Sequence, residues 1–155
     1  MSNLASTSVR RCAPGDLGAL ARLFDAYRQF NGKGLALEAG RDFLERRLAT
    51  GEASVFVADA ENSRVIGFTL LYATYSSVSL GRVFIVNDLY VAAPFRRRGV
   101  GSALLQAAAD HARHEGAVRL TASTAIENVP TQILNEANGF IRDRSYLVYH
   151  MRTNG

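Results

Sequence analysis

The chemically most distinctive part of the sequence is a turn rich in arginine and glycine, Arg96-Arg97-Arg98-Gly99-Val100-Gly101-Ser102. It follows an apolar run typical of a buried strand and opens an amphipathic helical pattern. A helix N-terminus has free backbone N–H groups and a partial positive charge, so it binds anions. Glycine lets a phosphate approach the backbone, and arginine donates paired hydrogen bonds to phosphate oxygens. The turn therefore predicts a phosphate-binding site.

The spacing excludes two common phosphate-binding motifs. The chain has no Gly-x-x-x-x-Gly-Lys-Ser/Thr sequence, so it is not a P-loop protein. Gly99 and Gly101 could begin a dinucleotide fingerprint, but Leu104 stands where the third glycine belongs. The structural alternative is a solvated arginine-rich loop in which the glycines only open a helix.

The turn resembles the defining motif of the GNAT superfamily of N-acetyltransferases, Arg/Gln-x-x-Gly-x-Gly/Ala, which Arg96, Gly99 and Gly101 match. A second patch, residues 127–131 followed by Asn138-Gly139-Phe140, is similar to the family's later helix. The resemblance covers residues 9–151 and is nearest to the polyamine and thialysine acetyltransferase branch. It implies a GNAT fold, with a central mixed sheet flanked by helices. It also implies transfer of an acetyl group from acetyl-CoA to a primary amine, by direct attack and with a backbone oxyanion hole.

The same resemblance implies which residues contact acetyl-CoA. The backbone of Leu89, Tyr90 and Val91 would pair with the pantetheine arm, and the N–H of Val91 would face the thioester oxygen. The expected pyrophosphate contacts are Arg96, Arg97, Arg98, Gly99, Val100, Gly101 and Ser102. Asn128 and Thr131 would contact the lower part of the cofactor.

Two positions depart from the pattern of this branch. Many relatives carry a glutamate that acts as general base where this chain has Asn87, and a tyrosine acid where it has Asn135. Neither amide titrates. Deprotonating a lysine-like amine costs about 4.6 kcal/mol at pH 7, whereas releasing an unprotonated thiolate costs about 2 kcal/mol. The missing base is therefore the greater loss.

Three remedies for the missing base stay open. Asp88 could take the proton, although strand alternation points its side chain away from the face of Asn87. A water chain held by amides and carbonyls could remove the proton instead, or the acceptor could be a weaker base than lysine. The same two amides motivate an alternative function, a non-catalytic acyl-CoA sensor.

The rest of the sequence predicts one α/β domain over residues 1–155, with its core at about 9–151. The expected strands are 9–13, 54–58, 65–75, 83–91, 119–123, 140–144 and 146–151. The expected helices are 17–29, 38–50, 99–115 and 130–137. The 83–91 strand is nearly continuous in apolar residues, so it belongs in the middle of the sheet, with one interruption at Asn87-Asp88.

Composition limits the remaining possibilities. Cys12 is the only cysteine, so no intrachain disulfide forms, and His111 and His114 lack a third ligand for a metal. The net charge is +4, but no nucleic-acid-binding motif accompanies it. No apolar segment approaches the ~20 residues of a membrane span, and the polar N-terminus lacks an export signal. We therefore expect a cytoplasmic enzyme that acts on a small-molecule or protein amine. We also expect a homodimer, paired through the apolar segment Tyr146-Leu147-Val148-Tyr149.

Overall fold

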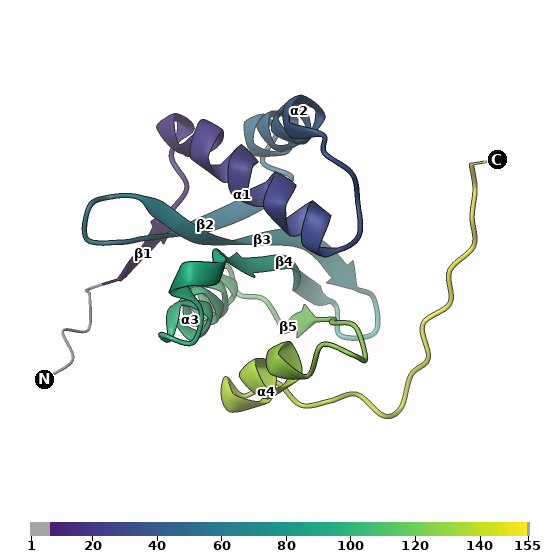
Figure 1. Cartoon of the computed structure of the whole chain (residues 1–155). Coiled ribbons are helices and arrows are strands. Elements are labelled where there is room, and N and C mark those ends of the chain that lie inside the picture. The colour runs from purple at the N-terminus through teal and green to yellow at the C-terminus, as the bar shows by residue number, and fades with distance from the viewer. Residues whose placement is uncertain (1–6, 155) are drawn as a thin grey trace, which may run out of the picture.

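A mixed five-stranded sheet with helices on both faces forms the frame of the protein, which a computed structural model describes over residues 7–154 (Figure 1). Its strands are β1 (Ser8–Arg11), β2 (Ala53–Asp59), β3 (Val65–Ser76), β4 (Gly81–Val91) and β5 (Arg119–Ala122), in that order across the sheet. The first four pair antiparallel with their neighbours, and β5 runs parallel to β4. This confirms the expected fold class. Most of the polar N-terminus lies outside the described residues.

The four helices follow the predicted apolar stripes. They are α1 (Leu17–Phe30), α2 (Leu37–Ala49), α3 (Val100–His114) and α4 (Val129–Ala137), with short 3-10 turns at Pro14–Asp16 and Ala93–Phe95. Helices α1 and α2 cover one face of the sheet, whereas α3 covers the other (Figure 1). Gly51 follows α2 with a φ of +70°, the left-handed conformation that ends a helix.

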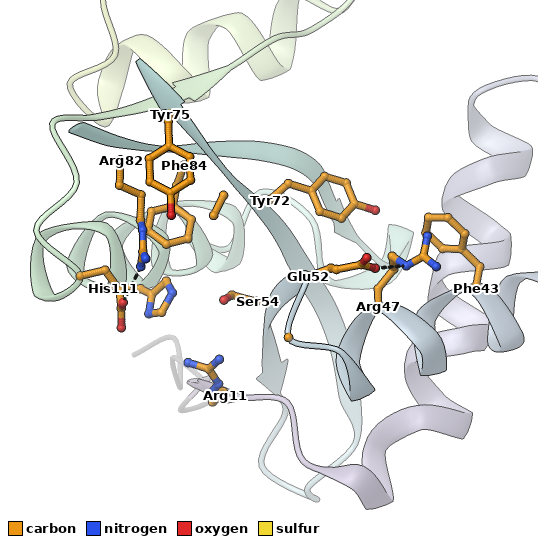
Figure 2. Close-up of a pocket in the computed structure, with 13 residues that line it drawn as sticks. Arg11, Phe43, Arg47, Glu52, Ser54, Tyr72, Tyr75, Arg82, Phe84 and His111 are labelled. Atoms are coloured by element: carbon orange, nitrogen blue, oxygen red, sulfur yellow. Dashed lines mark hydrogen bonds and ion pairs between the residues drawn. The ribbon is translucent and has the colours of Figure 1, made fainter. Parts of the chain in front are cut away.

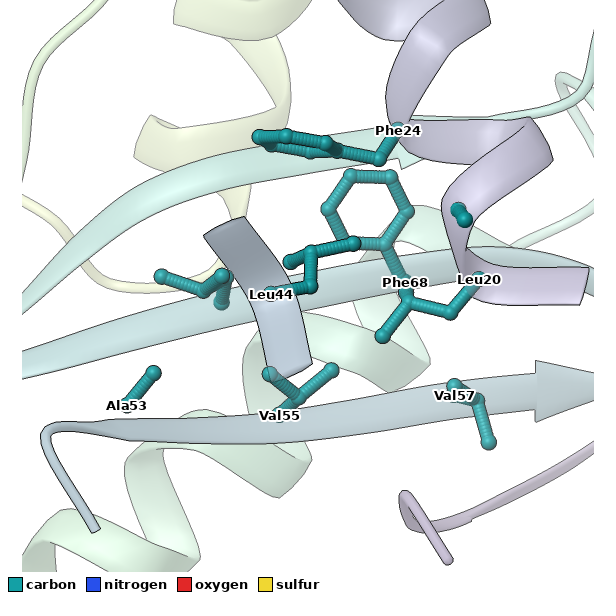
Figure 3. Close-up of a cluster of buried hydrophobic side chains, with 9 residues drawn as sticks. Leu20, Phe24, Leu44, Ala53, Val55, Val57 and Phe68 are labelled. Carbon is teal, nitrogen blue, oxygen red and sulfur yellow. The ribbon is translucent and has the colours of Figure 1, made fainter. Parts of the chain in front are cut away.

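Two apolar layers hold the helices to the sheet, because alternate strand residues point to opposite faces. The layer under α1 and α2 contains Leu20 and Phe24 of α1, Leu44 of α2, and inward residues of β2 and β3 such as Phe68 (Figure 3). The layer under α3 contains Leu71, Phe84, Val86, Leu105, Ala108 and Ala112. The face that a β4 side chain points to therefore decides which helices it meets.

A β-bulge interrupts β4 at Asn87-Asp88, where the sequence showed a break in the apolar run. Leu70 pairs with Asp88 and Leu71 pairs with Val86, so Asn87 has no opposite residue on β3. The buried hydroxyl of Thr69 donates a hydrogen bond to the carbonyl of Asp88, at 3.0 Å. The bulge shifts the alternation of side chains along β4 by one residue. Val86 therefore faces α3, whereas Asp88 faces the α1 side.

The prediction of two C-terminal strands, at 140–144 and 146–151, is wrong. Residues 141–154 are exposed and form neither helix nor strand, and they run away from the sheet (Figure 1). Alternating apolar side chains suit a strand, but a strand forms only where a neighbouring edge can accept its backbone hydrogen bonds. No such edge of the described chain lies beside this segment.

The bulge yields a first prediction. Thr69→Val should lower the free energy of unfolding by about 1–2 kcal/mol, because a buried carbonyl loses a partner. Thr121→Val, at an exposed position on β5, is the control and should change stability by under about 0.5 kcal/mol. Urea unfolding measures both variants, and equal costs would contradict a structural role for the Thr69 hydroxyl.

Candidate active site

The backbone of β4 has a free edge over its last residues. β5 pairs with β4 only at Val83–Val86, so beyond that point the two strands part. The N–H of Ala92 donates to the carbonyl of Ile66 on β3, at 2.8 Å. Antiparallel ladders alternate, so the backbone groups of Leu89 and Val91 point away from β3 and into the gap. This edge can accept an extended ligand as though it were another strand.

An uncapped helix N-terminus lies at the end of this edge. Gly99, the N-cap of α3, has a φ of +81° and no side chain to bond the helix N–H groups. The first intrahelical bond runs from the N–H of Ala103 to the carbonyl of Gly99, at 3.0 Å. The N–H groups of Val100, Gly101 and Ser102 therefore precede the hydrogen-bonded turns, where an anion can bind them.

The three arginines of the turn occupy different positions. Arg96 donates from Nε to the carbonyl of Val91 at 2.7 Å, and its guanidinium lies 5.2 Å from the ring centroid of Tyr90. It therefore holds the end of β4 to the turn. Arg97 and Arg98 are exposed, and Arg97 has a left-handed φ of 61°. These two side chains are the ones most available to a phosphate.

Packing between two helices explains why residue 101 is a glycine, and the sequence did not indicate this. A Cβ at this position would lie 2.9 Å from Cδ2 of Leu134 on α4, so the missing side chain lets α4 pack against α3. Gly99 has open space around it, and its left-handed φ accounts for the residue there. Only one of the two glycines is thus explained by its own backbone conformation.

Helix α4 forms the other wall of the site and is tied to α3 at its C-terminal end. Asn138 donates from Nδ2 to Oγ of Ser102 at 3.0 Å, and its Oδ1 accepts from Gln106 at 3.0 Å. At the opposite end of α4, Oδ1 of Asn128 accepts from the N–H of Thr131 at 3.3 Å and so caps the helix. Sequence reasoning missed the role of Asn138, because an Asn-Gly pair after a helix also reads as a simple stop.

The two polar residues of the bulge have opposite environments. Asn87 is exposed, whereas Asp88 is 7% exposed. Asn87 donates from Nδ2 to Oδ2 of Asp88 at 3.1 Å, and Tyr27 of α1 also hydrogen-bonds this carboxylate. Burial raises the pKa of Asp88 above its usual value, and the two hydrogen bonds partly oppose that rise. A buried carboxylate with a raised pKa is suited to taking a proton near neutral pH.

Tyr27, which hydrogen-bonds Asp88, lies in a cluster of aromatic rings on the α1 side. The ring of Tyr27 lies 6.0 Å from those of Phe68 and Tyr90, and burial raises the pKa of its hydroxyl. Sequence reasoning missed Tyr27, which reads only as part of the apolar stripe of α1. Asn135 is elsewhere, on α4, where its backbone carbonyl accepts from Asn138 and Phe140.

A cavity of about 710 Å³ opens at the other end of β4, away from the N-terminus of α3 (Figure 2). One end is formed by Arg82, Phe84 and His111, and the other by Phe43, Arg47 and Tyr72. Arg47 pairs with Glu52 at 2.6 Å, and Arg82 pairs with Glu115 at 3.0 Å. Burial and the charge of Asp88 raise the pKa of Tyr72, so the Tyr72 end lies within electrostatic reach of Asp88.

Other site types are not found within residues 7–154. These residues contain no cluster of three or more His, Cys, Asp or Glu side chains that could hold a metal ion. His111 instead packs between the rings of Phe56 and Phe84, with centroids 5.4 and 5.0 Å away. None of the described helices combines the length and the apolar character needed to cross a membrane.

A mixed sheet that parts between β4 and β5, beside an uncapped helix N-terminus, is the architecture of an acyl-CoA-dependent acyltransferase. A model described as the Acetyltransferase (GNAT) family matches residues 20–140, and the chain belongs to this family. Over 142 residues it is 39% identical to an uncharacterized N-acetyltransferase, YhfO, of Bacillus subtilis (strain 168). The matched region covers 92% of this chain and 95% of that relative.

Solved structures agree with this assignment. The crystal structure of a probable acetyltransferase is 38% identical, has a TM-score of 0.90, and covers 96% of this chain and 99% of its own. AAC(6')-Iy in complex with the bisubstrate analog CoA-S-monomethyl-acetylneamine shares the fold at 23% identity, with a TM-score of 0.78 and coverage of 95% and 99%. The chain is therefore an acetyltransferase that uses acetyl-CoA as its acyl donor, and the parted strands and uncapped helix N-terminus fit that ligand.

A substitution at Arg97 separates the effect on acetyl-CoA binding from the effect on the stability of the fold. Arg97→Gly should weaken acetyl-CoA binding about tenfold, since one charge-assisted phosphate contact is worth about 1.4 kcal/mol. It should leave the melting temperature unchanged or raise it, because glycine adopts the left-handed φ without strain. Ser63→Gly, at another left-handed position, with a φ of 59°, is the matched control and should leave affinity unchanged. Calorimetric titration measures affinity, and unaltered binding by Arg97→Gly would show that the Arg97 side chain does not contact the phosphates.

Proposed function

We propose that the chain transfers the acetyl group of acetyl-CoA to a primary amine, with Asp88 as the proton acceptor. The observation that carries this proposal is the buried Asp88 carboxylate, held by Asn87 and Tyr27 at the bulge where β4 loses β5 as its partner. The non-catalytic sensor is the weaker alternative, because the relatives of 38–39% identity are described as acetyltransferases.

The acyl donor is proposed to lie along the free edge of β4. The backbone groups of Leu89 and Val91 would pair with its pantetheine arm, whereas those of Tyr90 face β3. The turn from Arg96 to Ser102 would hold its pyrophosphate. Acetyl-CoA supplies a thioester whose carbonyl carbon is open to attack by an amine. The N–H of Val91 faces the gap, where it can donate to the oxygen on which negative charge develops. Asn128 and Thr131 would flank the donor from α4.

Asp88 replaces the base that is absent at position 87. A lysine-like amine must lose a proton at a cost of about 4.6 kcal/mol at pH 7, which a nearby carboxylate with a raised pKa reduces. The ammonium first gives one proton to Asp88, and the neutral amine nitrogen then forms the new C–N bond. As the C–S bond breaks, the nitrogen loses its second proton and the thiolate sulfur takes one up, so that one further proton passes from Asp88 to water. No titrating acid is assigned to the sulfur, because Asn135 cannot protonate it.

The acceptor is proposed to approach from the Tyr72 end of the cavity, since Tyr72 and Tyr27 are the aromatic side chains whose pKa values respond to Asp88. Tyrosine rings bind organic cations through their faces. Polyamines, lysine-like amino acids and protein amines are all candidates. The Asn128-x-Pro130-Thr131 sequence favours the polyamine and thialysine branch.

The pH dependence of the rate tests Asp88. A general base works when deprotonated, so kcat/KM should rise as the pH increases through the raised pKa of Asp88 and then flatten. Asp88→Asn should lower kcat/KM at neutral pH by about 10²–10⁴ and leave a rise of about tenfold per pH unit that follows the free amine. Tyr27→Phe removes a hydrogen bond that lowers the pKa of Asp88, so the midpoint should move to higher pH.

One control variant and one binding measurement accompany this experiment. Tyr75→Phe, at an exposed tyrosine on the same sheet, should leave the midpoint in place. Acetyl-CoA affinity should be unchanged in Asp88→Asn. A wild-type rate that follows the free-amine fraction throughout, with no separate titration, would assign the proton to water and exclude Asp88.

An acceptor panel tests the reaction itself. Release of free thiol from acetyl-CoA should require a primary amine: cadaverine, lysine or spermidine should support turnover, and 1,5-pentanediol should not. The diol matches cadaverine in length, so it tests nitrogen against oxygen as the attacking atom. Equal thiol release with the diol, or turnover with none of the amines, would contradict amine acetylation.

We further propose that the protein is a homodimer. The supporting observation is the exposure of Tyr146, Leu147, Val148 and Tyr149, each about four-fifths exposed in the single chain. A contiguous apolar segment of this kind marks an interaction surface.

A further inference from the structure

The cavity of about 710 Å³ at the start of β4 has two ends, which lie on opposite faces of the sheet (Figure 2). At one end, Tyr72 packs in the layer under α1 and α2. At the other end, Ser54 lies opposite Leu71, and Ala73 lies opposite Phe84. Leu71 and Phe84 belong to the layer under α3, and residues opposite each other in a ladder share a face. This second end, here called the α3-face pocket, therefore opens on the α3 side.

Helix α3 covers only part of the sheet face beneath it. The helix ends at His114, and Gly116 then turns the chain toward β5 with a left-handed φ of +68°. Strand alternation points Ala73 and Tyr75 of β3 to the α3 side, yet both are exposed. A ligand can therefore lie on the sheet where the helix stops.

The charges of the α3-face pocket leave one cation without a carboxylate. Arg82 pairs with Glu115 at 3.0 Å, whereas Arg11 forms no ion pair in the described part of the chain. The guanidinium of Arg11 instead lies 6.0 Å from the ring centroid of Phe56. Burial and the charge of Arg11 lower the pKa of His111, so this imidazole is neutral at neutral pH. An anion would balance the remaining charge of Arg11.

The groups that can donate hydrogen bonds to such an anion lie on β1 and β2. Arg11 pairs with Phe56 of β2, and Ser54 precedes Phe56 by two residues, so Arg11 and Ser54 are diagonal neighbours on the α3 face. A guanidinium and a hydroxyl can both donate to one carboxylate. Glu115 and the C-terminal end of α3 carry negative charge, so the anionic group belongs beside Arg11 and away from them.

An apolar floor lies beside these donors. Phe84 lines the pocket, and its ring centroid lies 5.0 Å from that of His111 on α3. Tyr75 lies at the exposed rim, and the small side chain of Ala73 leaves room above the sheet. Aromatic faces and edges favour contact with other rings. The combination of a cation, a hydroxyl and aromatic surface suits a ligand that carries a carboxylate on an aromatic ring.

We propose that the α3-face pocket binds a small aromatic carboxylate, with the carboxylate group on Arg11 and Ser54 and the ring against Phe84. Figure 2 shows Arg11, Ser54 and His111 on one side of the cavity, and Tyr72 and Arg47 on the other. The site is a second ligand site of the protein, and it does not depend on which amine the enzyme acetylates.

The α3-face pocket is distant from both parts of the proposed active site. Asp88 faces the α1 side of the sheet and lies six residues along β4 from Arg82, which is about 20 Å in an extended strand. The turn at 96–102 lies at the opposite end of the 15-residue helix α3, about 22 Å away. A small ligand in the pocket reaches neither of them, so the pocket stays accessible while acetyl-CoA is bound.

Calorimetric titration with 2-naphthoate tests the site in the full-length chain. We expect saturable binding whose dissociation constant changes by less than about threefold when acetyl-CoA saturates the protein. The neutral 2-naphthamide has the same ring system and should bind at least about tenfold more weakly, because it lacks the charge. Displacement of naphthoate by acetyl-CoA would place it at the turn before α3 and overturn the proposal. Equal affinities for the acid and the amide, or no binding at ~10 mM naphthoate, would also overturn it.

Substitutions at exposed positions locate the bound naphthoate. Arg11→Gln should weaken its binding at least about tenfold, because the charge-assisted hydrogen bond is lost. Ala73→Phe fills the pocket without changing its charge and should weaken binding by at least as much. Arg113→Gln removes the same charge from the last turn of α3, outside the pocket, and should leave the dissociation constant within about twofold.

One further variant separates the two ends of the cavity. Arg47→Gln removes the cation of the Tyr72 end and should leave naphthoate binding within about twofold. If Arg47→Gln weakens binding and Arg11→Gln does not, the ligand lies in the Tyr72 end and the proposal fails. Unaltered binding by Ala73→Phe would exclude the α3-face pocket as well. Circular dichroism and the melting temperature show that each variant is folded.

Discussion

The structure depends on one constraint: β4 has β5 as its neighbour for only part of its length. β5 pairs with β4 at Val83–Val86 and then leaves, so the last residues of β4 keep a free backbone edge inside the protein. Backbone N–H and C=O groups require partners, and an extended ligand can supply them. The same strand leads directly into the turn before α3, so the free edge and the uncapped helix N-terminus form one continuous binding surface.

Packing between α3 and α4 holds two of the elements beside this gap together. The missing side chain of Gly101 lets Leu134 approach α3, and Asn138 bonds both Leu134 and Ser102. On the other side, Arg96 bonds the carbonyl of Val91 and lies against Tyr90. Residues that look like ligand contacts in the sequence therefore also brace the site. The helix N-terminus itself stays free because its cap is a glycine.

The bulge in β4 lies between the free edge of that strand and the aromatic residues of α1. It displaces Asn87 from the ladder and turns Asp88 toward α1, where Tyr27 meets it. Burial makes ionisation of Asp88 less favourable, whereas the hydrogen bonds from Asn87 and Tyr27 favour it. The balance sets the pKa of this carboxylate above that of an exposed aspartate. A single irregularity in one strand thus places a titrating group beside the free edge.

The sequence alone predicted most of the local structure, because helices, strands and the turn before α3 depend on residue spacing. The order of elements as far as α4 and the helix start at Gly99 could be predicted in this way, as could the break in the apolar run at Asn87-Asp88. The contact of Tyr27 with Asp88 and that of Leu134 with Gly101 could not, since each joins segments far apart in the chain. The 146–151 segment shows the limit most clearly: its pattern specifies a strand, but only the tertiary structure shows that no edge of its own chain lies beside it. Side-chain pattern is a local property, whereas a strand also needs a partner for its backbone, and the fold decides where that partner is.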